Sequence, residues 1–242
     1  MEKALFTLQI ILFSLSLSVL GQSVVITPKK VTYTRPNTNS QFKETFTVTY
    51  PKISGTSTKL IKKIEDSISF KKVLSFNLQN ERFENNWLEV ADYTVSYNQN
   101  WILSIYLSME GTAAYPTFFG KSAVVDLKTG NRVTIQNVLT NLSKLVSTIR
   151  KIQKAEIEDS IKEIKSNPDF KDTDVAELFK FAEFKRIHLE DFSVQKDGIA
   201  FHYNYSFPRY YLPIEPGGNY LLSWKELKPF IRKGSLFAQF VK

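Results

Sequence analysis

The run of residues 101–109 constrains the fold more than any other stretch of this sequence. Large apolar side chains fall on every second position from Trp101 to Met109, and Ser104, Tyr106 and Ser108 occupy three of the four positions between them. A β-strand with one buried face converts this period of two into a single apolar surface. A second alternating run, 88–97, precedes it across the short polar turn 98–100, so the two runs predict an antiparallel hairpin.

Helical periodicity appears in two other places. Residues 58–70 place leucine and isoleucine at helical spacing after a Ser- and Gly-rich loop, and residues 141–166 carry a longer apolar stripe with a Lys- and Glu-rich opposite face. Further strands are expected at 42–50, 121–127 and 199–207. Strands in antiparallel pairs with helices between them predict an α+β fold, with antiparallel sheets, helices packed on one face, and two sub-parts.

The chain begins with a segment typical of an export signal. Lys3 precedes an apolar run of about 17 residues that ends at Leu20, and this length is at the short limit for a membrane span. We therefore expect a signal peptide at 1–21, an extended lead-in at 22–41, an N-terminal α+β part at 42–135 and a C-terminal α+β part at 136–242. After cleavage we expect no stable membrane insertion and a periplasmic or secreted location.

Composition excludes several classes of chemistry. The 242 residues include no cysteine, which excludes disulfides, thiol catalysis and zinc–thiolate sites. The formal net charge is +8, which favours anionic partners, although the lysines are spread along the chain rather than bunched. An exported basic protein of this kind is expected to bind an envelope polymer rather than nucleic acid.

Catalytic residue types are scarce. The two histidines, His188 and His202, are far apart in the sequence, and no Gly-x-Ser-x-Gly motif is present. Glu156 and its neighbouring acids alternate with lysines, as expected for a solvated helix face. We therefore assign no catalytic residue, no metal and no cofactor. A Ser-His-Asp arrangement brought together by the fold remains an alternative that the sequence does not exclude.

Exposed aromatic residues are the better functional signal. Residues 110–120, EGTAAYPTFFG, connect two expected strands and contain more aromatic material than a plain turn needs. We expect Phe118 or Phe119 to enter the core, and we predict Glu110 and Tyr115 as ligand-binding residues. Two further candidates lie in a Pro- and Tyr-rich loop near the C-terminus: Tyr210 and Tyr211.

The order of several short motifs resembles a known exported bacterial domain of largely unknown function. The motifs are VDLKTG at 125–130, FSVQKDGIAF at 192–201 and LSWKEL at 222–227. That domain occurs in the extracellular part of lysozyme-sensing anti-sigma factors and beside peptidoglycan deacetylase domains. The resemblance implies a non-enzymatic α+β module in two parts. It usually carries Gly-Gly-Ala-His where this chain has Gly-Thr-Ala-Ala at 111–114, so the histidine is replaced here.

The resulting hypothesis is an exported, non-enzymatic binding module. Its expected partner is peptidoglycan or another anionic envelope polymer, or a protein such as a lysozyme. Lysozymes are typically basic, so the charge of +8 would not steer the two proteins together. The alternative is a cell-envelope polymer hydrolase, or a deacetylase accessory, with a site made of carboxylates or His202.

Overall fold

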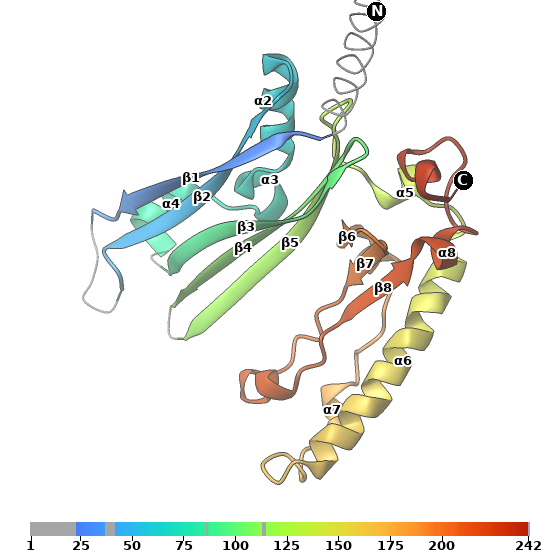
Figure 1. Cartoon of the computed structure of the whole chain (residues 1–242). Helices are drawn as coiled ribbons and strands as arrows, with labels where there is room; N and C mark the ends of the chain where they lie inside the picture. Colours follow the sequence, from blue (N-terminus) through green and yellow to red (C-terminus); the bar gives the residue numbers. More distant parts are fainter. Residues whose placement is uncertain (1–22, 37–41, 86, 113–114, 242) are drawn as a thin grey trace, which may run out of the picture. The chain divides into compact units, whose positions relative to one another are not determined.

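The computed structural model describes residues 23–36, 42–85, 87–112 and 115–241, so the expected signal segment lies outside the described residues. The chain divides into two compact units between Val133 and Thr134. Each unit holds one sheet with antiparallel pairing and its own helices, so the protein is an α+β protein with two sub-parts (Figure 1). No helix among the described residues has the length and apolarity that a membrane span requires.

The first unit is built on a five-stranded sheet in the order β1-β2-β3-β4-β5. Three pairings are antiparallel, and β2 and β3 pair in parallel over a short ladder. The strands are β1 Val25–Thr34, β2 Thr45–Ser54, β3 Leu88–Gln99, β4 Ile102–Thr112 and β5 Pro116–Asp126. Residues 102–109 of the alternating run therefore form the first part of a strand, β4.

The segment 22–41, expected to be an extended lead-in, contributes the complete edge strand β1. Pro28 lies opposite Pro51 of β2 in the register. A proline lacks the N–H that a central ladder needs, so it is confined to an edge or to the end of a ladder. Both prolines meet this condition, because β1 is an edge and the parallel β2–β3 ladder involves only Thr47 and Val48 of β2.

Short helices cover one face of this sheet (Figure 1). They are α2 Thr58–Ser67, α3 Phe70–Leu74, α4 Leu78–Asn80 and the π-helix η1 Glu81–Asn85. The helix expected at 58–70 is thus two helices, because Ser69 takes an extended conformation and caps α3 by accepting a hydrogen bond from the Lys72 N–H. The core between helices and sheet includes Ile64, Phe70, Val73, Leu103, Ile105 and Leu107.

Trp101 was expected to begin a strand, but it lies in the turn between β3 and β4. Asn100 and Trp101 have φ angles of 53° and 64°. Two consecutive positive φ angles define the two-residue hairpin turn whose twist matches that of the flanking strands. In the turn, the Trp101 indole makes a cation–π contact with Lys128, whose ammonium lies 5.4 Å from the ring centroid.

A buried ion pair ties the end of β1 to the π-helix. Arg35 and Glu81 are 3% and 1% exposed, and their side chains meet at 2.6 Å. Arg35 also donates to the carbonyl of Leu88, while Glu81 accepts from the Leu88 N–H at 2.8 Å. These additional hydrogen bonds offset part of the large cost of burying two charges.

The second unit has the three-stranded antiparallel sheet β6-β7-β8 and one long helix, α6 Leu142–Ser166. The strands are β6 Phe192–Val194, β7 Gly198–His202 and β8 Asn219–Ser223. Figure 1 shows α6 running along one face of this sheet. Shorter helices complete the unit: α5 Ile135–Val138, α7 Val175–Leu178, η2 Arg186–Glu190, η3 Arg209–Ile214, α8 Trp224–Leu227 and η4 Leu236–Val241.

The strand expected at 199–207 ends at His202. Beyond it, Tyr203 retains one backbone hydrogen bond to Gly218, and the Asn204 side chain then accepts from the Ser206 N–H. Ser206 has a φ of 57°, which no strand tolerates. Tyr205 and Phe207 are nevertheless buried. The predicted apolar face is therefore present, although the strand ladder ends at His202.

Candidate functional site

The stretch 110–120 forms the hairpin that joins β4 and β5, and it holds two of the predicted binding residues. Glu110 is exposed on β4 and lies opposite Phe118 of β5. Tyr115 is exposed, and its carbonyl accepts a hydrogen bond from the Thr117 hydroxyl. Residues 113–114, where the resembling family keeps its histidine, lie outside the described residues.

The expectation that Phe118 or Phe119 enters the core is wrong. The two side chains are 57% and 51% exposed. They point to opposite faces of β5 near the β4–β5 hairpin. The Phe119 ring makes an edge-on contact with the Trp87 ring, with centroids 5.5 Å apart.

Tyr210 and Tyr211, the other predicted binding residues, lie on η3 in the second unit. Their rings are 5.1 Å apart between centroids, and both contact Phe170 from the loop after α6, at 5.6 and 6.2 Å. Tyr210 is exposed and Tyr211 is half-buried. The structure gathers these two tyrosines into one aromatic cluster, and it places the Glu110 and Tyr115 pair in the other unit.

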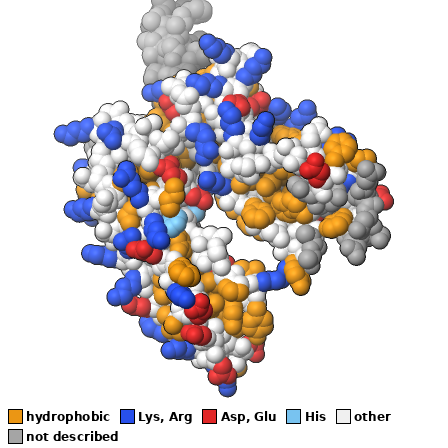
Figure 2. All heavy atoms as spheres, turned by 180° about the vertical axis from the view of Figure 1, so that it is seen from behind, with side chains coloured by type: hydrophobic (Ala, Val, Ile, Leu, Met, Phe, Trp, Pro, Cys, Tyr) orange, Lys and Arg blue, Asp and Glu red, His pale blue; other side chains and the backbone are white. Residues whose placement is uncertain are grey.

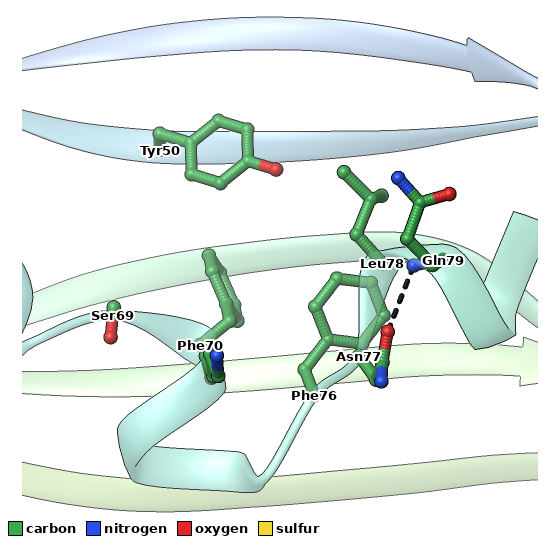
Figure 3. Close-up of a pocket in the computed structure, with 8 residues that line it drawn as sticks. Tyr50, Ser69, Phe70, Phe76, Asn77, Leu78 and Gln79 are labelled. Carbon is green, nitrogen blue, oxygen red and sulfur yellow. Dashed lines mark hydrogen bonds between the residues drawn. The ribbon is translucent and has the colours of Figure 1, made fainter.

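An aromatic pocket that sequence reasoning missed lies between the sheet and the short helices of the first unit (Figure 3). Its volume is about 310 Å³, at the lower end of the range for small-molecule sites. Its lining residues are Tyr50, Ser69, Phe70, Lys71, Phe76, Asn77, Leu78 and Gln79. In Figure 3 the Tyr50 ring on β2 and the Phe70 ring on α3 point toward the same space from opposite sides.

Packing around the pocket fixes its aromatic walls. The Phe70 ring meets the rings of Tyr50 and Phe76 edge to face, with centroids 6.1 and 6.4 Å apart. The Tyr50 hydroxyl lies 2.9 Å from the Tyr33 hydroxyl. Burial, followed by this hydrogen bond, raises the pKa of Tyr50 above its ordinary range, so the phenol stays neutral and the wall stays uncharged.

The rim of the pocket is polar. The side-chain oxygen Oδ1 of Asn77 caps α4 by accepting from the N–H groups of Gln79 and Asn80, at 3.0 and 3.2 Å. The side chains of Lys71 and Gln79 are exposed beside it. Sequence reasoning missed these rim residues because 71–87 lacks clear periodicity. The signal that could have indicated a site is the close spacing of Phe70 and Phe76, with helix-capping residues between and after them.

A second pocket lies beside the β4–β5 hairpin in the same unit. Its volume is about 390 Å³. Its lining residues are Val73, Leu74, Ser75, Trp87, Met109, Phe119, Gly120 and Lys121. The lining is mainly apolar and has a single ionisable side chain, Lys121.

The structure does bring Ser193 and His202 together in the second unit. The Ser193 hydroxyl oxygen lies 3.0 Å from Nε2 of His202, on neighbouring strands. Burial lowers the pKa of His202, and the negative charge of Asp191 opposes that shift. The imidazole is therefore neutral at pH 7, as a general base must be, but Ser193 is only 5% exposed, which limits access of a substrate to its hydroxyl.

Glu156 was expected on a solvated helix face, and this interpretation is wrong. Its carboxylate accepts hydrogen bonds from the hydroxyls of Tyr205 and Tyr220, at 2.7 and 2.9 Å, and from the Gly218 N–H at 3.0 Å. Burial, with a contribution from Glu156, raises the pKa of both phenols above their ordinary range. This cluster joins α6 to the strand region opposite and is a structural hydrogen-bond network.

Comparison with known proteins supports the fold and goes no further. No family model matches the chain, and no curated protein matches it. A DUF3298 family protein from Pseudomonas aeruginosa PAO1 has a similar structure, with a TM-score of 0.56, 14% identity, and coverage of 88% of this chain and 97% of that chain. A DUF3298 family member from Bacteroides fragilis NCTC 9343 is also similar in structure. Its TM-score is 0.52 at 13% identity, and the match covers 91% of this chain and 98% of that chain. Both neighbours thus belong to a family of unknown function.

Proposed function

We propose that this protein is an exported, non-enzymatic binding module that holds a cell-envelope glycan in the aromatic pocket of its first unit. The observation that carries this proposal is the lining of that pocket. It combines the rings of Tyr50, Phe70 and Phe76 with amide, hydroxyl and ammonium groups, and none of its eight lining residues is a carboxylate or a histidine.

Sugars suit such a lining. The C–H face of a sugar ring is apolar and packs on aromatic rings, and its hydroxyl and acetamido groups need donors and acceptors around the edge. Lys71, Asn77 and Gln79 supply those groups at the rim. The ammonium of Lys71 also favours a glycan that carries carboxylates, as envelope polymers do.

The same lining argues against catalysis at this position. Glycoside hydrolysis in most families uses two carboxyl groups on either side of the scissile bond. With no acid or histidine in the lining, the pocket has no pair of groups for general acid–base work. A module that binds without reacting is the function consistent with this chemistry.

The charge of the whole chain adds weak support. A net charge of +8 raises the local concentration of an anionic polymer, and Figure 2 shows Lys and Arg side chains spread over the face in view rather than gathered in one patch. The same charge disfavours a basic lysozyme as the partner. Contacts in the pocket, rather than charge, therefore have to provide specificity.

The test is a titration of the purified protein with chitotetraose and with soluble peptidoglycan fragments, at low and moderate salt. The double variant Lys71→Ala/Gln79→Ala removes exposed rim groups without touching the core, and we expect about a tenfold loss of affinity from the lost hydrogen bonds. Lys62→Ala, exposed on α2 and outside the pocket, is the matched control and should bind like the wild type.

Two outcomes would contradict the proposal. One is the absence of binding to either glycan. The other is binding that disappears at moderate salt and is equally weakened by Lys62→Ala, since that pattern indicates charge alone.

A hydrolase centred on Ser193 and His202 is the second candidate, favoured by their separation of 3.0 Å. An accessible nucleophile paired with a base reacts with fluorophosphonates and turns over activated esters. Labelling that is lost in Ser193→Ala would support this candidate. Absence of labelling, expected from the burial of Ser193, would leave the binding module as the function.

A further inference from the structure

The two edges of the five-stranded sheet differ in how they are protected. β1 carries Pro28, Lys29 and Lys30, and proline and lysine are the residues that natural edge strands use to prevent further pairing. The free end of β5 carries instead the exposed pair Phe118 and Phe119. These residues have high strand propensity and give the edge no such protection.

The backbone groups that this edge presents can be assigned from the hydrogen bonds at its other end. The Val124 carbonyl accepts from the Val133 N–H, and the Asp126 N–H donates to the Asn131 carbonyl, so even-numbered residues of β5 point away from β4. The β4–β5 register has no shift along its length. Peptide groups alternate in direction along a strand, so the N–H and C=O of Phe118 and Gly120 also point outward.

Within the described part of the chain, no backbone group is paired with these outward groups of Phe118 and Gly120. The hairpin is thus the position in the first unit where a strand could be added. Strand addition to an exposed sheet edge is a general mode of peptide recognition, in which the main chain provides affinity and pockets for alternate side chains provide specificity.

A pocket for an alternate side chain lies beside this edge. It is the apolar pocket of about 390 Å³ lined by Trp87, Met109, Phe119 and Lys121, among others. Phe119 and Lys121 point to the same face of β5, because they are two residues apart. A peptide residue opposite Phe119 would direct its side chain into this pocket, and the residue two positions away would lie opposite Lys121.

Lys121 indicates the charge of the occupant. Among the described residues, no carboxylate lies within 4.0 Å of its ammonium. An ammonium at the wall of an apolar pocket gains most from a carboxylate brought by the ligand, since the low local polarity strengthens that pair.

We infer that the β5 edge binds an extended peptide segment of an acidic partner, with an apolar side chain in the pocket and a carboxylate two residues away on Lys121. This inference concerns a different pocket from the proposed glycan site and does not depend on it. The pattern required of the peptide is apolar-x-acidic, in either direction along the strand.

The test uses the synthetic peptide Thr-Thr-Glu-Thr-Leu-Thr-Glu-Thr-Thr, whose symmetric pattern fits both strand directions. Titrated to about 1 mM, the weak end of specific affinities, it should shift the amide resonances of Phe118 and Gly120 and slow their hydrogen exchange. The control peptide with lysine in place of glutamate should bind roughly tenfold more weakly or not at all.

Phe118→Pro and Phe118→Thr form a matched pair. Proline removes the outward N–H without removing a bond to β4, so it should abolish peptide binding while the melting temperature shows that the fold is retained. Threonine keeps that N–H, and the Phe118 ring lies on the face away from the pocket, so Phe118→Thr should bind within about threefold of the wild type.

Lys121→Glu tests the charge independently of the backbone, and it should reverse the preference between the two peptides. The inference fails if the wild type binds neither peptide, if Phe118→Pro binds like Phe118→Thr, or if Lys121→Glu leaves the preference unchanged. It also fails if chitotetraose displaces the peptide from the same resonances, which would make this a glycan site, or if Phe118→Pro converts a dimer into a monomer, which would make the occupant a second copy of the chain.

Discussion

Glu156 lies among lysines and other acids on α6, yet its carboxylate accepts hydrogen bonds from two buried phenols and one backbone N–H. Its neighbour Glu158 is exposed and has one ion pair with Lys154, four residues earlier on the helix. At the level of single residues the two acids are indistinguishable in sequence. Their roles differ because only Glu156 faces the tyrosines of the opposite layer.

Replacing Glu156 should therefore be costly. Glu156→Ala leaves buried polar groups without their acceptor, and we expect the free energy of unfolding to fall by about 2–4 kcal/mol. The matched control Glu158→Ala removes an exposed ion pair, so its effect should stay within about 0.5 kcal/mol. Urea denaturation measures both, and equal effects would show that the tyrosine network contributes nothing.

The buried phenols also predict a dependence of stability on pH. The pKa values of Tyr50, Tyr205 and Tyr220 are all raised above the ordinary value of 10.0, with burial as the largest cause. The unfolded chain releases these protons near pH 10 and the folded chain retains them. The stabilisation is thus complete below about pH 10 and is lost as the pH rises further.

Ultraviolet absorbance of phenolate measures this prediction. Among the 11 tyrosines, those three should ionise only together with unfolding. A smooth titration of all tyrosines near pH 10, with no loss of the folded signal, would contradict it.

At the level of elements, the β4–β5 hairpin depends on two glycines for different reasons. A Cβ on Gly111 would lie 2.0 Å from the Trp87 carbonyl oxygen and 2.8 Å from the Leu88 Cα, which are backbone atoms. A Cβ on Gly120 would lie 1.7 Å from the hydroxyl of Tyr106, the far end of a side chain. The backbone cannot move without breaking the β3–β4 ladder, whereas a tyrosine can rotate.

We therefore expect Gly111→Ala to destabilise the protein by about 3 kcal/mol or more, and Gly120→Ala by roughly 1–2 kcal/mol. Tyr106→Ser should relieve most of the additional cost of Gly120→Ala and none of the cost of Gly111→Ala. Double-mutant cycles from thermal or urea unfolding check both statements. Equal relief in the two cases would refute the distinction between backbone and side-chain contacts.

At the level of the whole molecule, each unit has its own buried core. The core of the first unit lies between its sheet and α2 and α3, and the second unit buries residues of α6 against its own sheet. A compact unit with its own core is expected to fold independently.

Residues 134–242 expressed alone should thus form a folded, cooperatively melting protein. Circular dichroism and the dispersion of amide resonances measure this, with the full chain as the reference. A fragment that lacks a cooperative transition would show that its core requires the first unit.

The sequence by itself determined the features that depend on local periodicity. Alternation at 101–109 predicted β4, helical spacing predicted α6, and the element order predicted an α+β protein in two sub-parts. A period of two or of 3.6 reports which side of an element is apolar, and that information is local. The β1 edge strand gave a weaker signal, because none of its residues is fully buried.

Only the tertiary structure decided which side chains meet. The aromatic pocket joins Tyr50 of β2 to residues 69–79, Ser193 meets His202 across two strands, and Glu156 meets Tyr220 across 64 positions of sequence. No periodicity encodes such pairs, because they depend on how separate elements pack against each other. The predicted binding residues Glu110, Tyr115, Tyr210 and Tyr211 were chosen from local composition, and they stay predictions for the same physical reason.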